Sequence, residues 1–238
     1  MPLNRGYQYV KAATNLVLAM LSRDSTQKKR QAELGYWRLQ KAKKGKLPSD
    51  HYEYFFTDHF DLDTGEYDGK RVLDIGCGPR GSLDWATMAE QNIGLDPLVN
   101  EYENLGFADD SPMEYVDSGA EDIPFPDEHF DIVTSFNSLD HVDDLQRSIA
   151  EIKRVTAPDG LFLLITDVNH DPTVTEPISY GWDIVDEFRP EFELVWQDRR
   201  EKSEDGIYAS ARFGDPYDFS NEETRYGVLS AKFERRSL

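Results

Sequence analysis

The chain has 238 residues, 39% of them hydrophobic and 12% aromatic, which suits one large α/β domain with an accessory segment and excludes a disordered protein. Residues 1–50 hold eleven Lys and Arg against three Asp and Glu, so the net charge of −20 divides into +8 there and −28 in the rest. Such an acidic body argues against a nucleic-acid partner. The single cysteine, Cys77, excludes an internal disulfide and favours a reducing, cytoplasmic location.

The first fifty residues predict a helical cap. Helical spacing runs over residues 7–21 and 25–44, with Asp24 or Ser25 as N-cap of the second helix and Gly45 near its end. A third short helix is expected to start at Ser49. The apolar run 16–21 is too short to cross a bilayer and no cleavage site follows it, so we expect neither a membrane partner nor a signal peptide. We therefore divide the chain into a cap over 1–62 and a main domain over 63–238.

The main domain predicts a doubly wound α/β sheet. Apolar runs without clean alternation, typical of strands buried on both faces, lie at 71–75, 92–96, 113–117, 130–136 and 160–168. Helices are expected at 81–90, 97–105 and 143–156. Two further strands, 192–201 and 226–236, are expected to pair antiparallel at one edge, joined by a polar loop without a helix. Ligands of such a sheet bind at the carboxyl ends of the strands.

A glycine turn follows the first of these strands. The letters GCGPRG at 76–81 fit G-x-G-x-x-G, and Asp96 follows Gly76 by twenty positions, which is the pattern of a dinucleotide-binding fold. However, Asp74 stands two residues before Gly76, where its carboxylate would repel a pyrophosphate. That charge instead favours a ligand with an ammonium or sulfonium group. An NAD-dependent oxidoreductase is thus the alternative interpretation.

Four motifs in order resemble those of class I S-adenosylmethionine-dependent methyltransferases, in the branch typified by ubiquinone and menaquinone methyltransferases. They are VLDIGCGPRG, IGLDP, SGAEDIPFPDEHFDIVTSFNSLDHVDD and IKRVTAPDGLFLLITDV, which together cover residues 70–168. The resemblance implies a Rossmann-like, doubly wound, seven-stranded sheet with an antiparallel last strand. It also implies S-adenosylmethionine as cofactor and methyl transfer to a small molecule, or else a non-catalytic relative that only binds the cofactor.

The resemblance carries over to individual residues where the motifs align. The glycine turn with Asp74 would receive the methionine part, Asp96 the ribose, Asp122 with the Ile123 N–H the adenine, and Asn137 would lie under the sulfonium. Arg80 stands where the family often has a glycine, so it either clamps the methionine carboxylate or points to solvent, with Gly81 taking over the turn. The implied cofactor-binding residues are Asp74, Gly76, Gly78, Arg80, Gly81, Asp96, Pro97, Glu121, Asp122, Ile123 and Asn137.

The expected chemistry is an in-line displacement, preferably on an oxygen of the acceptor. His141, directly after the fourth strand, is the predicted general base, and Asp140 would raise its pKa and orient its ring. His170 and His51 are the competing bases. Acids follow the fourth and fifth strands where a catechol-type methyltransferase places magnesium, but Asp143 and Asp144 fit a helix start and we expect no metal. The acidity of the chain fits either a salt-adapted protein or an ordinary acidic enzyme.

Overall fold

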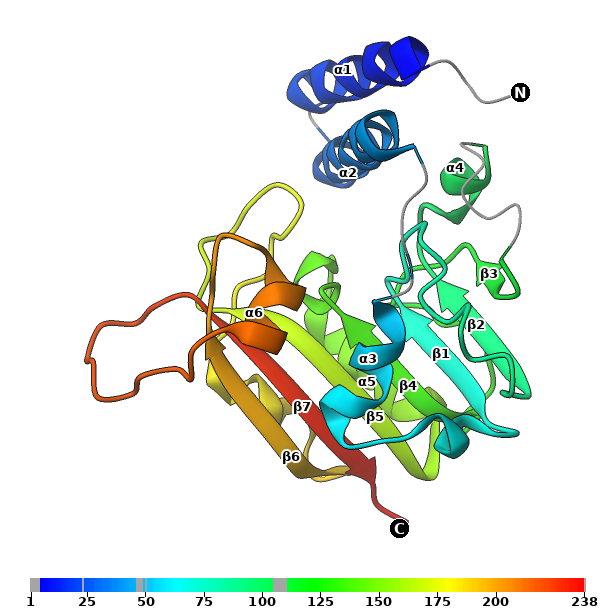
Figure 1. Cartoon of the computed structure of the whole chain (residues 1–238), viewed down its shortest axis with the longest axis vertical. Helices are drawn as coiled ribbons and strands as arrows, with labels where there is room; N and C mark the ends of the chain where they lie inside the picture. The colour runs from blue at the N-terminus through cyan, green and yellow to red at the C-terminus, as the bar shows by residue number, and fades with distance from the viewer. Residues whose placement is uncertain (1–4, 23, 46–48, 50, 105–110, 238) are drawn as a thin grey trace.

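In the part of the chain that the structure describes, seven strands form one mixed sheet (Figure 1). This structure is a computed structural model, and it describes residues 5–22, 24–45, 49, 51–104 and 111–237. The strand order is β3-β2-β1-β4-β5-β7-β6. The strands are β1 Arg71–Ile75, β2 Gln91–Leu95, β3 Glu114–Val116, β4 Phe130–Phe136, β5 Thr156–Val168, β6 Phe192–Glu201 and β7 Gly227–Arg235.

The pairing of these strands confirms the predicted doubly wound sheet. Strands β1 to β5 are parallel wherever they pair, and β7 pairs antiparallel with both β5 and β6. The antiparallel last strand is therefore correct, although it lies inside the sheet and β6 forms the edge. In the register, Asp74 of β1 lies between Gly94 of β2 and Thr134 of β4, at the centre of the parallel half.

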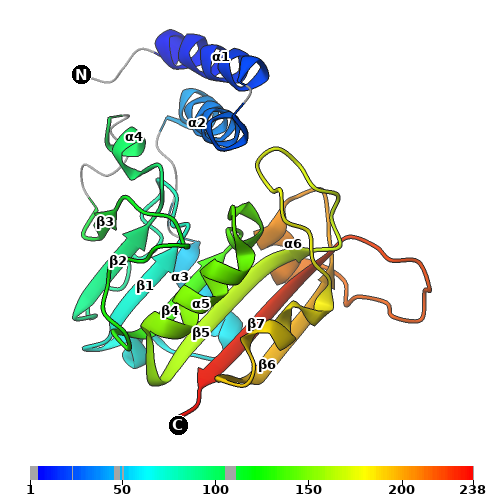
Figure 2. The ribbon, with the colours of Figure 1, turned by 180° about the vertical axis from the view of Figure 1, so that it is seen from behind.

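Helices cover both faces of the sheet. They are α1 Arg5–Leu21, α2 Ser25–Lys44, α3 Tyr52–Phe56, α4 Val99–Glu103, α5 Leu145–Val155 and α6 Ile207–Phe213, with 3₁₀ turns η1 Asp58–Phe60, η2 Thr64–Tyr67, η3 Leu139–His141 and η4 Trp182–Phe188. Figure 2 shows α5 on one face, while α3 and α6 lie on the other in Figure 1. The structure therefore has three layers, as expected of a sheet whose strands are apolar on both sides.

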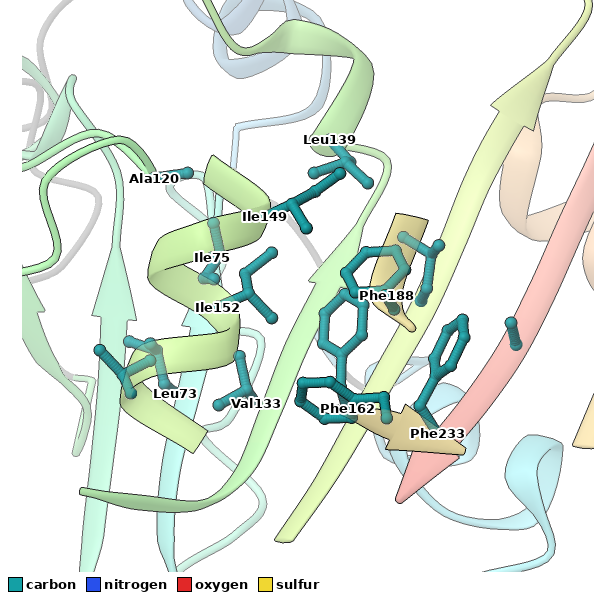
Figure 3. Close-up of a cluster of buried hydrophobic side chains, with 14 of the residues drawn as sticks. Leu73, Ile75, Ala120, Val133, Leu139, Ile149, Ile152, Phe162, Phe188 and Phe233 are labelled. Carbon is teal, nitrogen blue, oxygen red and sulfur yellow. The ribbon is translucent and has the colours of Figure 1, made fainter. Parts of the chain in front are cut away.

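Each face has its own apolar core. On the α5 face, Ile149 and Ile152 of the helix pack with Leu73, Val133 and other buried strand residues (Figure 3). Their spacing gives α5 an apolar stripe that only the sheet can cover, and Asp144 caps its first turn by accepting from the Arg147 N–H. On the other face, α3, η1, η2 and α6 supply a second core rich in aromatic rings. The sheet is thereby fixed between two dry layers, and its carboxyl edge is left for ligands.

The helices α1 and α2 form a hairpin over the carboxyl ends of the strands (Figure 1). Both helices match their predicted ranges, and Asp24 is the N-cap of α2, accepting a hydrogen bond from the Gln27 N–H. The boundary at residue 62 stays a prediction, because α3 and η1 precede it and pack into the core of the sheet. None of the helices in the described ranges has the length and apolarity to cross a bilayer.

Two of the predicted elements are wrong and three helices are shorter than expected. The helix expected from Ser49 forms over Tyr52–Phe56, and that expected over 143–156 forms over Leu145–Val155. Residues 81–90 form successive i→i+3 turns instead of a helix, with the Asn92 side chain donating to the Ala86 carbonyl. Conversely, the loop between β6 and β7 contains α6, which lies between Gly206 and Gly214. The helix expected over 97–105 is formed over Val99–Glu103, and residue 105 lies outside the described residues.

Candidate functional site

Two adjoining cavities lie at the carboxyl edge of the parallel strands. The larger has a volume of about 540 Å³ and the smaller about 260 Å³. Both are lined by Glu33, Gly76, Asp96, Asn137 and His141, so these five residues mark where the cavities meet. Ligands of doubly wound sheets bind at this edge, which is where the sequence predicts a cofactor.

The glycine turn makes the floor of this junction. Gly76 has a φ of +71°, and a Cβ there would lie 2.2 Å from the Cβ of Ser138. Gly78 has a φ of +59°, and its N–H donates to Asp96 Oδ2 at 3.1 Å. Any side chain at Gly76 would therefore be both strained and blocked. The turn exposes backbone to the cavities, as the sequence motif predicts.

Asp74 is a buried carboxylate at the end of β1 that lines the larger cavity. Thr134 donates to its Oδ1 at 2.7 Å, and Ser82 donates to its Oδ2. Burial raises the pKa of Asp74 to about 6, even though both hydroxyls favour the charged form. A cationic group in the cavity would favour the ionised carboxylate, so Asp74 suits an ammonium-bearing ligand.

Asp96 lies where the two cavities meet, just beyond β2. Its Oδ1 accepts from the Leu98 N–H at 2.9 Å, while its Oδ2 accepts from Gly78. Burial and the nearby charge of Glu33 raise the pKa of Asp96 to about 7, against these two hydrogen bonds. Each carboxylate oxygen keeps a further lone pair for a ligand hydroxyl. The residue can thus act as the predicted ribose acceptor while also holding the turn.

Arg80 faces the larger cavity instead of pointing wholly to solvent. Its guanidinium carbon lies 5.1 Å from the centre of the Trp37 ring, and its Nε is buried without a hydrogen bond among the described residues. This cation–π contact ties the turn after β1 to the helix α2. Gly81, with a φ of +70°, makes the adjacent turn, and a Cβ there would collide with Asp84. The arrangement fits a clamp on an anionic ligand group.

The predicted adenine contacts find no support in the structure. Asp122 is exposed and lines neither cavity, and the Ile123 N–H donates to Glu151 Oε2 at 2.9 Å. The smaller cavity is instead lined by the preceding residues, from Ser118 to Glu121, together with Pro97 and Leu98. Glu121 is also engaged, because its Oε1 accepts from the Asp143 N–H at 2.7 Å. The residues from Ser118 to Glu121 are therefore the part of this loop that is available to a ligand in the smaller cavity.

The helix α2, which belongs to the predicted helical cap, covers the smaller cavity with residues that the sequence did not single out. Thr26, Lys29, Arg30 and Glu33 line it from above. The Lys29 ammonium donates to the His141 carbonyl and to Asp143, both at 2.5 Å. The alternating lysines and arginines of this helix read equally well as a solvated face, so only the fold distinguishes the two interpretations.

The predicted base and its neighbour lie in a cluster of acids. The Nδ1 of His141 is 3.6 Å from Glu33, and its Nε2 is 4.0 Å from Asp140 and 3.9 Å from Glu176. Burial lowers the pKa of His141. The hydrogen bond to Glu33 and the charges of the three carboxylates together outweigh this effect and raise the pKa to about 9. At neutral pH the ring then holds a proton and is a poor acceptor of another. The base role of His141 stays a prediction, which this environment does not favour.

The far end of the larger cavity carries a second polar group that the sequence analysis did not identify. Lys202 of the segment after β6 contacts both oxygens of buried Asp167, at 2.7 and 2.5 Å, and the Tyr226 hydroxyl donates to the same carboxylate at 2.6 Å. Aromatic rings of Tyr52, Phe56, Phe136 and Tyr208 line the space between this group and the glycine turn. His51, the third predicted histidine, lines neither cavity and contacts the Tyr52 ring.

Residues 73–164 match the family described as "Methyltransferase domain". An uncharacterized methyltransferase of Bacillus subtilis, YcgJ, is 34% identical over 116 residues, 46% of each chain. A fatty-acid O-methyltransferase of Mycolicibacterium smegmatis is 29% identical over 41% of this chain and 37% of its own. A ubiquinone/menaquinone biosynthesis C-methyltransferase of Psychromonas ingrahamii is 29% identical over 48% of each. The crystal structure of the YcgJ protein has a TM-score of 0.56, with 18% identity, over 79% of this chain and all of that one.

These matches concern one part of the molecule. The chain spans less than half the length of these curated relatives, and the match covers the strands and turns that build the two cavities. At 18% identity the superposition establishes the fold alone. The relatives named for their reactions methylate carbon in one case and oxygen in the other.

Proposed function

We propose a small-molecule acceptor for this chain, which contains a class I S-adenosylmethionine-dependent methyltransferase domain and takes that cofactor. The observation that carries the proposal is the shared wall of the two cavities at Gly76 and Asn137. A ligand that extends from one cavity into the other has its middle where the two cavities meet. The rest of the larger cavity, which is lined by aromatic residues, then stays free for a second molecule. A methyl donor and an acceptor need such a meeting point to align for displacement.

The residues present fit the cofactor. The smaller cavity, with Asp96 at its inner end and the backbone of 118–121 along its side, suits a nucleoside. Asp74 and Arg80, of opposite charge, face the larger cavity on the other side of the glycine turn, where an amino acid would find partners for its ammonium and its carboxylate. When bound, the cofactor supplies an electrophilic methyl group on a positively charged sulfur.

The chain's own residues position and enclose these ligands. Asn137 has a φ of +56°, and its N–H donates to the Ile165 carbonyl at 2.7 Å, which fixes its side chain at the junction. Lys29 and Glu33 of α2 line the smaller cavity, where they would limit the access of water to a bound nucleoside. Positioning of this kind supplies most of the rate of a displacement on a sulfonium.

The larger cavity supports an acceptor that is at least partly aromatic or apolar. Seven aromatic residues line it, and Glu33, Glu176 and Asp205 add negative charge. Carboxylates around the opening disfavour a strongly anionic acceptor. We therefore propose methyl transfer to an oxygen of a neutral ring-bearing or sugar-like molecule.

The proposal is tested by incubating the protein with a metabolite extract and cofactor carrying an isotope-labelled methyl group. We expect mass spectrometry to find label on a hydroxyl of a neutral small molecule, and none with an Asn137→Ala variant that is folded. Label on carbon or nitrogen would contradict the oxygen assignment. Cofactor binding without any labelled product would instead favour the non-catalytic alternative.

A further inference from the structure

A cluster of three facing ligand residues lies beside the larger cavity, with Asp140 buried and His141 and Glu176 half-buried. One ligand atom from each of these residues lies within 4.8 Å of those of the other two. The Asp140 side chain is 1% exposed, and no described neighbour donates a hydrogen bond to either of its oxygens. The His141 Nε2 is likewise buried without a hydrogen bond among the described residues. Buried polar atoms almost always have partners, so the two oxygens of Asp140 and the Nε2 of His141, which have none among the described residues, need an explanation.

The separations are those of ligands around a metal ion. The Nε2 of His141 is 4.0 Å from Asp140 Oδ1 and 3.9 Å from Glu176 Oε1, too long for hydrogen bonds. Two ligand atoms at about 2.0–2.2 Å from one ion lie up to about 4 Å apart when the angle at the ion is wide. A single ion can therefore contact all three atoms with small shifts of the side chains.

Outer partners hold these side chains with their ligand atoms inward. The other ring nitrogen of His141, Nδ1, faces Glu33 at 3.6 Å, and the other oxygen of Asp140, Oδ2, faces His170 Nε2 at 3.6 Å. The second oxygen of Glu176 accepts from the Thr173 hydroxyl at 3.2 Å. Metal-binding histidines commonly pair their remaining N–H with a carboxylate, and ligating carboxylates are oriented in the same way.

We propose that Asp140, His141 and Glu176 bind a divalent first-row transition ion such as Mn²⁺ or Zn²⁺. One imidazole with two carboxylates suits these ions better than Mg²⁺ or Ca²⁺, which prefer oxygen ligands alone. Binding of the ion would displace the Nε2 proton that the ring holds in the metal-free protein, and the dication would then balance the charge of the three carboxylates that face His141. This departs from the sequence-based expectation of no metal, which did not include Glu176 among the candidate ligands.

The site faces the acceptor space. His141 and Glu176 line the larger cavity, so open positions on the ion would be available to an oxygen of the acceptor. That contact rests on the proposed function, whereas ion binding itself does not.

The test is a titration of the full chain, stripped by a chelator, with Mn²⁺, followed by electron paramagnetic resonance and by calorimetry. We expect one ion per chain and nitrogen modulation of the bound Mn²⁺ signal that is lost in His141→Gln. Asp140→Asn and Glu176→Gln should each weaken binding at least tenfold, and Glu33→Gln by about 10–100-fold. Asp171→Asn, an exposed acid next to the cluster, is the matched control and should bind like the wild type.

The proposal would be overturned if the protein did not bind Mn²⁺, or if the wild type and folded Glu176→Gln bound it with equal affinity. Glu176 is only half-buried, so this variant keeps the test decisive if Asp140→Asn does not fold. A parallel titration with S-adenosylhomocysteine separates the two proposals. If the protein binds S-adenosylhomocysteine but not Mn²⁺, only the metal proposal is contradicted. If it binds Mn²⁺ but not S-adenosylhomocysteine, only the proposed function is contradicted.

Discussion

Protonation of Asp96 should control cofactor affinity near neutral pH. Raising the pKa of a buried carboxyl from 3.8 to about 7 corresponds to about 4 kcal/mol in favour of the neutral form. Hydrogen bonds from two ribose hydroxyls to the ionised group contribute about 1.5–3 kcal/mol each, or about 3–6 kcal/mol together. Their sum is large enough to offset the cost of ionisation, so binding should lower the pKa of Asp96 and release a proton.

Affinity for S-adenosylhomocysteine should therefore rise about fivefold from pH 6 to pH 7, about twofold more by pH 8, and then level off. The raised pKa of Asp96 has the opposite effect on the stability of the ligand-free protein, which should decrease as the pH rises. Because the folded state holds this proton more tightly than the unfolded chain, the free energy of unfolding should fall as pH rises from about 4 to about 7. Asp74, whose pKa is about 6, adds to both trends up to about pH 7, so the range from pH 7 to pH 8 reports mainly on Asp96.

Calorimetry in two buffers of different ionisation enthalpy measures both affinity and proton release. In Asp96→Asn, proton release at pH 7.5, where Asp74 is already ionised, should disappear, and affinity at pH 8 should fall by about 1–3 kcal/mol. Asp122→Asn, at an exposed acid outside both cavities, should match the wild type. Proton release that persists in folded Asp96→Asn would refute the placement of the ribose at this carboxylate.

Three further predictions concern stability. Gly76→Ala should lower the free energy of unfolding by about 3 kcal/mol or more, because its Cβ would lie 2.2 Å from that of Ser138. Gly69→Ala, where the added Cβ meets open space at a φ of +66°, should lower the free energy of unfolding by only about 1 kcal/mol. Equal effects of the two variants in denaturant titrations would contradict the steric argument. Lys202→Met should lower it by about 3 kcal/mol, because Asp167 would lose its cation, and the double variant with Asp167→Asn should recover most of this; additive losses would refute a coupled pair. The melting temperature should rise from low to molar salt as the acidic body is screened, and an unchanged melting temperature would remove the salt-adapted interpretation.

The sequence predicts best where local pattern and tertiary burial agree. The strand runs RVLDI and FDIVTSF coincide with β1 and β4, because a strand buried on both faces must be apolar along its length. The segment 81–90 shows the limit, since a ten-residue helix depends on packing more than on propensity. There, Leu83 and Ala86 are buried in the second core by tight turns instead. The helix α6 had a usable signal, because Ile207 and Ala211 are apolar at i and i+4 between two glycines.

The site was predictable where a motif fixes the backbone and not where distant segments meet. The glycine turn, Asp74 and Asp96 follow from one stretch of sequence, and the structure brings them together. The cover by α2 and the contact of Lys202 with Asp167 join residues more than thirty positions apart, which a single sequence does not reveal. The adenine contacts of Asp122 and Ile123 stay a prediction, because the residues of that loop that line the smaller cavity are the preceding ones, from Ser118 to Glu121. A displacement of two or three positions along a loop changes which residue faces a cavity, but it does not change the sequence motif from which the loop is predicted.

Calorimetric titration of the full chain with S-adenosylhomocysteine and, separately, with NAD tests the central claim most directly. The two ligands share an adenosine but differ in what lies beyond the ribose, where Asp74 and Arg80 face the larger cavity. We predict saturable binding of S-adenosylhomocysteine at one site per chain, weakened in Asp74→Asn, and no saturable binding of NAD. Saturable binding of NAD with none of S-adenosylhomocysteine would contradict the account.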